Sequence, residues 1–125
     1  MSKYSSFETQ FELSDCDKYI RAVRFNLIRR NGEIKAGAFK SNNGGVSVTR
    51  SNELLLNRAL TYMKSHFEGE MAVFPTIICR ENKIFEKHSP SPGHNFNHWE
   101  LYGNDSLNPL TDEQIDTLVD ATVFM

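Results

Sequence analysis

The chain has 125 residues, of which 39% are hydrophobic and 24% charged, and its formal net charge is −2. Such a chain is long enough for one domain, too apolar to be disordered, and not basic enough to coat nucleic acid through bulk charge. Two cysteines are too few for a disulfide-scaffolded secreted domain. Neither a signal peptide nor an apolar run of the ~18 residues that a membrane helix needs is evident. A single cytoplasmic domain over residues 1–125 is therefore expected.

The first forty residues contain one strong turn signal. Residues 1–15 are polar with scattered aromatic side chains, which leaves open a flexible arm or a first edge strand. Apolar and β-branched residues over 19–28 predict a strand. Asn31-Gly32 then favours a type I′ turn, which needs positive φ at both central positions. A β-hairpin is therefore predicted over residues 19–40.

The middle of the chain is expected to form a strand, a helix and another strand. Residues 46–49 alternate valine with Ser47 and Thr49, which is typical of a strand. Ser51 is predicted to cap a helix over residues 51–68. One buried stripe at helical spacing supports that helix: Leu56, Leu60, Met63 and Phe67. A strand should follow over residues 71–76, where Pro75 restricts it to an edge or a bulge.

Residues 76–103 are predicted to form two strands around a loop rich in proline and glycine. The first strand is assigned to the short apolar run at 77–79 and its continuation at 84–85, and the second to residues 97–102. Thr111 and Gln114 match a capping box, so a last helix is expected over residues 111–124. The predicted order β-β-β-α-β-β-β-α indicates an α+β fold, with two helices packed on an antiparallel-rich sheet.

His98 and Glu100 are the candidate catalytic residues. They alternate with Trp99 and Leu101, so they should share one strand face, about 6–7 Å apart. A histidine that titrates near neutral pH beside a carboxylate suits acid–base chemistry or ligand binding. A solvent-facing polar side of the strand is the alternative interpretation.

A metal site is a second interpretation of the same region. His88, His94, His98 and Glu100 are side chains that zinc can use. Spacing alone constrains metal geometry loosely, and Pro92-Gly93 favours a loop, in which His88 and His94 would be solvated. No residue is therefore assigned as a metal ligand.

A candidate anion site consists of Arg21, Ser47, Thr49 and Arg50. Arg21 lies between apolar residues of the first strand, where its guanidinium could act as a fork for an anion. Arg50 follows the two hydroxyl residues and precedes the predicted helix, and helix N-termini attract anions. A charged sheet rim is the alternative. No phosphate-loop or serine-hydrolase motif is present, and Cys79 is interpreted as a core residue.

Several short motifs resemble those of a group of small uncharacterised bacterial proteins. The resemblance covers about residues 19–118. Its motifs are Tyr19-Ile20-Arg21-Ala22-Val23, Ala38-Phe39-Lys40, Gly45-Val46-Ser47-Val48-Thr49-Arg50, Ile78-Cys79-Arg80-Glu81 and His98-Trp99-Glu100-Leu101. This resemblance implies no activity.

A second resemblance is to ADP-ribosyl transferase folds. Those folds use an arginine on the first strand, a serine or threonine strand and a later glutamate, and Arg21, Ser47 and Glu100 occur in that order. The chain is short for that fold and lacks a second acidic or glutamine partner beside Glu100. The resemblance implies an enzyme that transfers ADP-ribose or cleaves NAD, with Glu100 stabilising positive charge.

These observations lead to three functional hypotheses. The first is recognition of a small anionic or nucleotide-like ligand in a polar pocket on the sheet, in which arginines pair with phosphate. The second is an enzyme, either an ADP-ribosyl-transferring or NAD-cleaving protein or a hydrolase with His98 as base. The third is a protein-interaction module, such as an inhibitor or immunity protein, that binds its partner through surface aromatic residues and an exposed edge strand.

Overall fold

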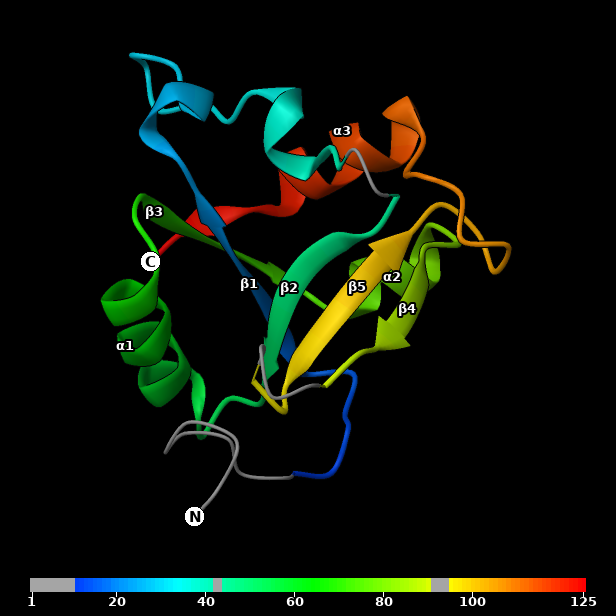
Figure 1. Ribbon diagram of the computed structural model, residues 1–125, viewed down its shortest axis with the longest axis horizontal. Helices are drawn as coiled ribbons and strands as arrows, with labels where there is room; N and C mark the ends of the chain where they lie inside the picture. The colour runs from blue at the N-terminus through cyan, green and yellow to red at the C-terminus, as the bar shows by residue number, and fades with distance from the viewer. Residues whose placement is uncertain (1–10, 42–43, 91–94) are drawn as a thin grey trace.

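The computed structural model describes residues 11–41, 44–90 and 95–125 and has the α+β fold that the sequence predicts (Figure 1). Residues 1–10 of the predicted arm, and Pro92, Gly93 and His94 of the predicted loop, lie outside the described residues. The elements are, in chain order, β1 (Lys18–Val23), the 3-10 helices η1 (Phe25–Leu27) and η2 (Ala36–Phe39), β2 (Val46–Ser51), α1 (Leu56–His66), β3 (Glu70–Pro75), α2 (Ile77–Glu81), β4 (Phe85–His88), β5 (His98–Tyr102), α3 (Asp112–Ala121) and β6 (Val123–Phe124).

The strands form one antiparallel sheet in the order β4-β5-β2-β1-β3-β6. β1 pairs with β3 along its whole length, from Lys18 to Val23. Its pairing with β2 covers only Lys18, Tyr19 and Ile20, after which the two strands diverge (Figure 1). The sheet is therefore split along one half of the β1–β2 boundary.

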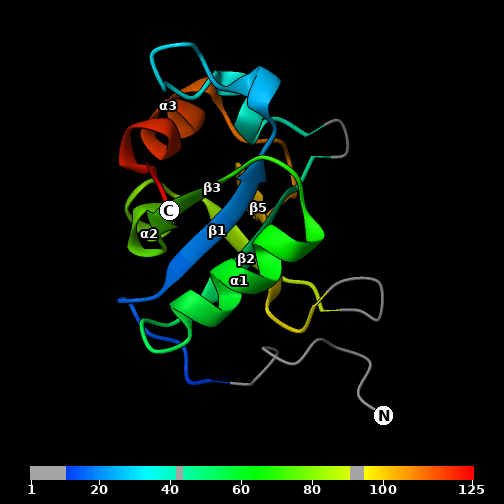
Figure 2. The ribbon, with the colours of Figure 1, turned by 90° about the vertical axis from the view of Figure 1, so that its left-hand side faces the viewer.

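Helices cover both faces of the sheet (Figure 2). α1 packs on one face through a small cluster of buried residues: Ile20, Ala59, Leu60, Met63, Met71 and Val73. α2, α3 and η2 cover the other face, where the larger core lies. The largest buried side chains of that core are Tyr19, Phe39, Phe74, Leu101 and Leu118. Burial on both faces is what drives a sheet of this size to fold.

The predicted hairpin over residues 19–40 is wrong, and so is its turn type: the chain turns at Asn31-Gly32, but only Gly32 has the positive φ that a type I′ turn requires at both positions. Ile28 and Ile34 form an isolated bridge around a turn closed by Arg29 N–H to Glu33 O at 2.7 Å. Residues after Ile34 form η2 instead of a strand. In η2 the adjacent residues Ala38 and Phe39 are both buried, which a strand with one covered face cannot achieve because its side chains alternate.

Two assignments in the predicted 71–85 region also change. Residues 77–79 belong to the short helix α2 rather than to a strand, because an apolar run this short is compatible with either structure. β3 lies between β1 and β6 and so is not an edge strand. Pro75 is tolerated because it is the last residue of β3, where the ladder needs no further donor.

The helix boundaries are partly as predicted. Ser51 is the last residue of β2 and does not cap the helix, contrary to the prediction. Asn52 takes this role ahead of α1, because its Oδ1 accepts a hydrogen bond from Leu55 N–H at 2.8 Å. α3 begins with the predicted capping box between Thr111 and Gln114, with both reciprocal hydrogen bonds present. No helix in the described part of the chain is long and apolar enough to cross a membrane.

Candidate functional site

β2 lies at the centre of the candidate site, between β1 and β5. Ser47 faces Glu100 and Thr49 faces His98 across the β2–β5 ladder. Residues directly opposite in an antiparallel pair project from the same face. The four polar residues selected from the sequence therefore share one face of the sheet, as their alternation predicts.

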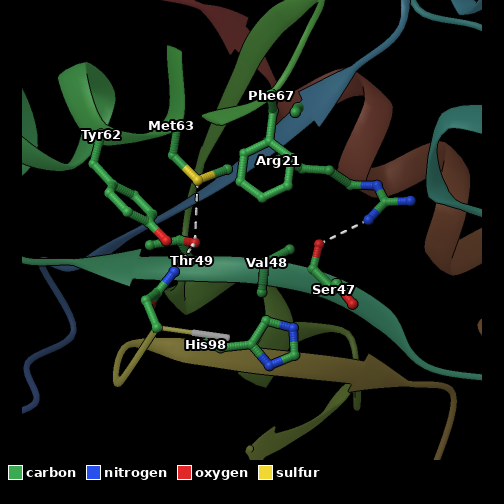
Figure 3. Close-up of a pocket in the computed structure, with 10 residues that line it drawn as sticks. Arg21, Ser47, Val48, Thr49, Tyr62, Met63, Phe67 and His98 are labelled. Carbon is green, nitrogen blue, oxygen red and sulfur yellow. Dashed lines mark hydrogen bonds between the residues drawn. The ribbon is translucent and has the colours of Figure 1, made fainter. Parts of the chain in front are cut away.

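Arg21 occupies the split between β1 and β2. Its Nε donates to the Ala38 carbonyl oxygen at 2.6 Å, and its Nη1 donates to the Ser47 carbonyl oxygen at 2.7 Å (Figure 3). Because β1 no longer pairs with β2 at this point, the guanidinium supplies donors that a neighbouring strand would otherwise provide. Arg21 thus belongs both to the fold and to the site.

No carboxylate of residues 11–41, 44–90 and 95–125 balances the charge of Arg21. None of the ion pairs among the described residues involves Arg21. Burial lowers the pKa of its guanidinium, but the ordinary value for arginine is so high that the group stays cationic. A half-buried cation held only by carbonyl oxygens attracts an anion.

Arg21 borders a cavity of about 260 Å³ between the sheet and α1 (Figure 3). The cavity wall combines polar and apolar side chains from β1, β2, α1 and the chain around β5: Arg21, Ala22, Ser47, Val48, Thr49, Tyr62, Met63, Phe67, Asn95 and His98. In Figure 3 the Phe67 ring lies beside Arg21, and His98 lies on the opposite wall. A mixed wall with a few convergent polar groups is typical of a small-molecule site.

The polar groups of the cavity are held by their neighbours. Thr49 Oγ1 donates to Met63 Sδ at 3.3 Å and accepts from Asn95 Nδ2 at 3.3 Å. His98 Nδ1 is 2.9 Å from the Ser89 carbonyl oxygen, and because a carbonyl can only accept, Nδ1 must carry a proton. The Asn95 side chain is 4% exposed, and its Oδ1 has no hydrogen-bond partner in the described part of the chain.

Glu100 lies next to the cavity but does not line it. Its Oε2 accepts a hydrogen bond from the Tyr102 hydroxyl at 2.7 Å. This bond, together with burial and the carboxylate charge, raises the pKa of Tyr102. The carboxylate is therefore oriented by a neighbour on its own strand and faces Ser47.

Arg50 is not part of this site, contrary to the prediction that grouped it with Arg21. It projects from the opposite face of β2 and is 4% exposed. Its Nε pairs with Asp17 Oδ2 at 2.9 Å, and Nη1 lies 3.6 Å from Glu86 Oε1. Its guanidinium also lies over the rings of Tyr19 and Trp99. The guanidinium of Arg50 is paired within the core. Of the four residues of the predicted anion site, only Arg21, Ser47 and Thr49 therefore line the cavity.

The sheet separates His88 from His98, the two described histidines that were considered for a metal site. His88 faces Trp99 across the β4–β5 ladder and stacks on it, with ring centroids 4.8 Å apart. His98 precedes Trp99 and so projects from the other face. No group of three metal-ligating side chains occurs within residues 11–41, 44–90 and 95–125.

Cys79 is a core residue, as the sequence indicates. It is fully buried, and burial, aided by the charge of Glu86, raises the pKa of its thiol. A thiol that resists ionisation is a poor nucleophile.

Sequence reasoning missed the contribution of α1 and of Asn95 to the site. Met63 and Phe67 belong to the predicted buried stripe of the helix, and both line the cavity with Tyr62. Met63 is buried in the α1 cluster as predicted, whereas Phe67 is not buried. Phe67 keeps 49% of its surface exposed. The only signal in the sequence for an exposed ring was the position of Phe67, two residues before Gly69, where the predicted helix ends.

Comparison of the chain with protein-family models, with curated proteins and with solved structures gives no match. The function must therefore be inferred from the chemistry of the site.

Proposed function

We propose that the protein binds a small anionic, nucleotide-like ligand in the cavity beside Arg21. The observation that carries this proposal is the guanidinium of Arg21, which is bound by two carbonyl oxygens and by no carboxylate of the described residues. The hydroxyl group of Ser47 adds a hydrogen-bond donor on the same wall, which Thr49 and His98 also line; the Thr49 proton is donated to Met63 Sδ and the His98 Nδ1 proton to the Ser89 carbonyl oxygen.

The energetic argument favours phosphate or carboxylate as the bound group. A cation removed from water is stabilised most by a negative partner, and hydrogen bonds to charged groups contribute about 1.5–3 kcal/mol each. The two carbonyl oxygens fix the orientation of the guanidinium before a ligand arrives, which lowers the entropy cost of binding. Arginine then presents its remaining donors in a planar fork.

The test is isothermal titration of the protein with ribose 5-phosphate and with inorganic phosphate. Arg21→Ala should weaken binding by about tenfold to a hundredfold, in line with the loss of one charge-assisted interaction. Arg30→Ala, which removes an exposed arginine outside the cavity, is the matched control and should leave binding unchanged. Equal affinity of the wild type and Arg21→Ala would overturn the proposal.

Because Arg21 also bridges β1 and β2, the same variants need a stability measurement. Arg21→Lys keeps the charge but loses the fork that reaches both carbonyl oxygens. Binding should therefore fall in Arg21→Lys by less than in Arg21→Ala, under conditions where circular dichroism shows each variant to be folded.

A second candidate function is ADP-ribosyl transfer or NAD cleavage. Its support is that Arg21 donates to the Ser47 carbonyl oxygen while Ser47 faces Glu100 in the β2–β5 register. In such a reaction the bond between nicotinamide and ribose breaks, nicotinamide leaves with the bonding electron pair, and a water or acceptor nucleophile forms the new bond to ribose. Glu100 would stabilise the positive charge that develops on ribose.

Chromatographic detection of nicotinamide released from NAD tests this candidate. Glu100→Gln should reduce turnover by about a hundredfold or more while leaving the anion affinity of the cavity intact. Glu33→Gln, in an exposed turn, is the control for loss of one carboxylate. Absence of turnover by the wild type would leave the binding proposal standing and remove the catalytic one.

A further inference from the structure

A second recess adjoins the cavity at the end of α1. It has a volume of about 500 Å³ and shares two wall residues, Ala22 and Phe67, with the cavity. The full wall is Ala22, Arg24, Phe25, His66, Phe67, Glu68 and Gly69. The two hollows therefore adjoin at Ala22 and Phe67.

The recess exposes two aromatic rings to solvent. Phe25 is 66% exposed and Phe67 is 49% exposed. Single exposed apolar residues need no explanation, but two phenyl rings that line one hollow next to a cation form a stacking surface. Arg24, His66 and Glu68 surround them with hydrogen-bond donors and an acceptor.

The conformation of this wall is fixed by the fold. Gly69 has φ +109°, and a Cβ at this position would overlap the Val23 carbonyl oxygen. The chain can therefore pass this close to β1 only with glycine. This close passage places Phe67 and Glu68 at the split end of β1, beside Ala22 and Arg24.

We propose that the recess binds the base of a nucleotide whose phosphate occupies the Arg21 cavity. This inference rests on the proposed anion-binding function and names its ligand class. The size of the two hollows supports it, because the cavity of about 260 Å³ lies below the ~300 Å³ at which sites for drug-sized ligands begin. A phosphate with its sugar fits there, whereas a planar base needs the adjoining space, where Phe67 and Phe25 offer ring faces.

The experiment compares AMP with ribose 5-phosphate, which carries the same phosphate and sugar without the base. The wild type should bind AMP about tenfold more tightly, as one stacked base typically contributes. Phe25→Ala, which truncates a ring that lines the recess but not the Arg21 cavity, should reduce this difference and leave the affinity for ribose 5-phosphate unchanged. Leu54→Ala, which truncates an apolar side chain that is 91% exposed and lines neither hollow, is the control and should keep the difference.

Two further variants separate stacking from a general effect on the fold. Phe67→Tyr preserves an aromatic face and should retain the preference for AMP, while Phe67→Ala should abolish it; because Phe67 also lines the Arg21 cavity, the preference is compared as the ratio of the two affinities. Equal binding of AMP and ribose 5-phosphate by the wild type would overturn the inference and leave the anion site intact. Failure of the wild type to bind either ligand would overturn both.

Discussion

Replacing Arg50 by alanine is expected to lower the free energy of unfolding by about 3–5 kcal/mol, because removal of one partner strands a buried charge. Arg50 Nε lies 2.9 Å from Asp17 Oδ2, and the two side chains are 5% and 1% exposed. The Ser14 backbone N–H, at 3.0 Å from Oδ2, would be left as the hydrogen-bond donor to this carboxylate. Asp17 Oδ1 is buried and has no hydrogen-bond partner within the described residues, so no second cation compensates for the loss.

The magnitude is large relative to the total stability of a domain, which is about 5–15 kcal/mol. A loss of 3–5 kcal/mol corresponds to a fall in Tm of roughly 10–20 °C for a chain of this size. Urea unfolding followed by fluorescence suits the measurement, because Trp99 is the only tryptophan of the sequence. The ring of Trp99 lies 5.1 Å from Arg50 Cζ, so its emission reports on this part of the core.

The double variant Asp17→Asn/Arg50→Met provides the decisive comparison. It removes both charges while keeping apolar volume, so it should be more stable than Arg50→Ala alone. At temperatures where the Arg50→Ala variant is folded, this variant should bind ribose 5-phosphate with the affinity of the wild type, because Arg50 projects from the face of β2 opposite to the cavity. A loss below about 1 kcal/mol in Arg50→Ala would refute the argument that this ion pair is essential to the core.

Two further predictions follow from the backbone and from buried ionisable groups. Gly69→Ala should destabilise the fold by more than about 2 kcal/mol, because the new Cβ meets the Val23 carbonyl. Gly32→Ala should cost about 1 kcal/mol, because its Cβ meets open space and only the positive φ opposes alanine. Similar urea midpoints for the two variants would contradict this prediction. Burial raises the pKa of Cys79 and Tyr19 above their ordinary values of 9.0 and 10.0, so the unfolded chain ionises first. The free energy of unfolding should stay constant up to about pH 9. Above that pH it should fall by up to ~1.4 kcal/mol per pH unit for each of the two side chains. In urea titrations, Cys79→Ala should remove the part of this decline that lies between about pH 9 and 10.

The sequence predicts those parts of the fold that depend on local signals. The alternation correctly placed Ser47 with Thr49 on one face of β2 and His98 with Glu100 on one face of β5. The capping box at Thr111 correctly placed the start of α3. Both signals act within a few residues, so a single sequence contains all the information they require.

Non-local contacts explain the errors. β1 was predicted to pair with the next segment of the chain, but its partners are β2 and β3, which begin at Val46 and Glu70. Burial of Ala38 and Phe39 under α3 favours the 3-10 helix η2 over a second hairpin strand. Such choices are decided by tertiary packing, which overrides weak local propensity.

The same distinction applies to the two arginines of the predicted anion site. Arg21 and Arg50 both lie on strands and both are flanked by apolar or hydroxyl residues in the sequence. Their roles differ because the core places Asp17 and Glu86 beside Arg50, and no carboxylate of the described residues pairs with Arg21. The partners of an arginine, rather than its local sequence, therefore determine whether it stabilises the fold or remains available to a ligand.

The split between β1 and β2 connects this difference to the shape of the site. Where two strands diverge, their backbone groups lose ladder partners and must be satisfied in another way. Arg21 satisfies the Ser47 carbonyl and is thereby fixed at the mouth of the opening. A continuous ladder would have needed no cation there and would have left no room for the cavity between β2 and α1. The feature that weakens the sheet at this point is thus the one that places an oriented guanidinium, which pairs with no carboxylate in the described part of the chain, next to a space of ligand size.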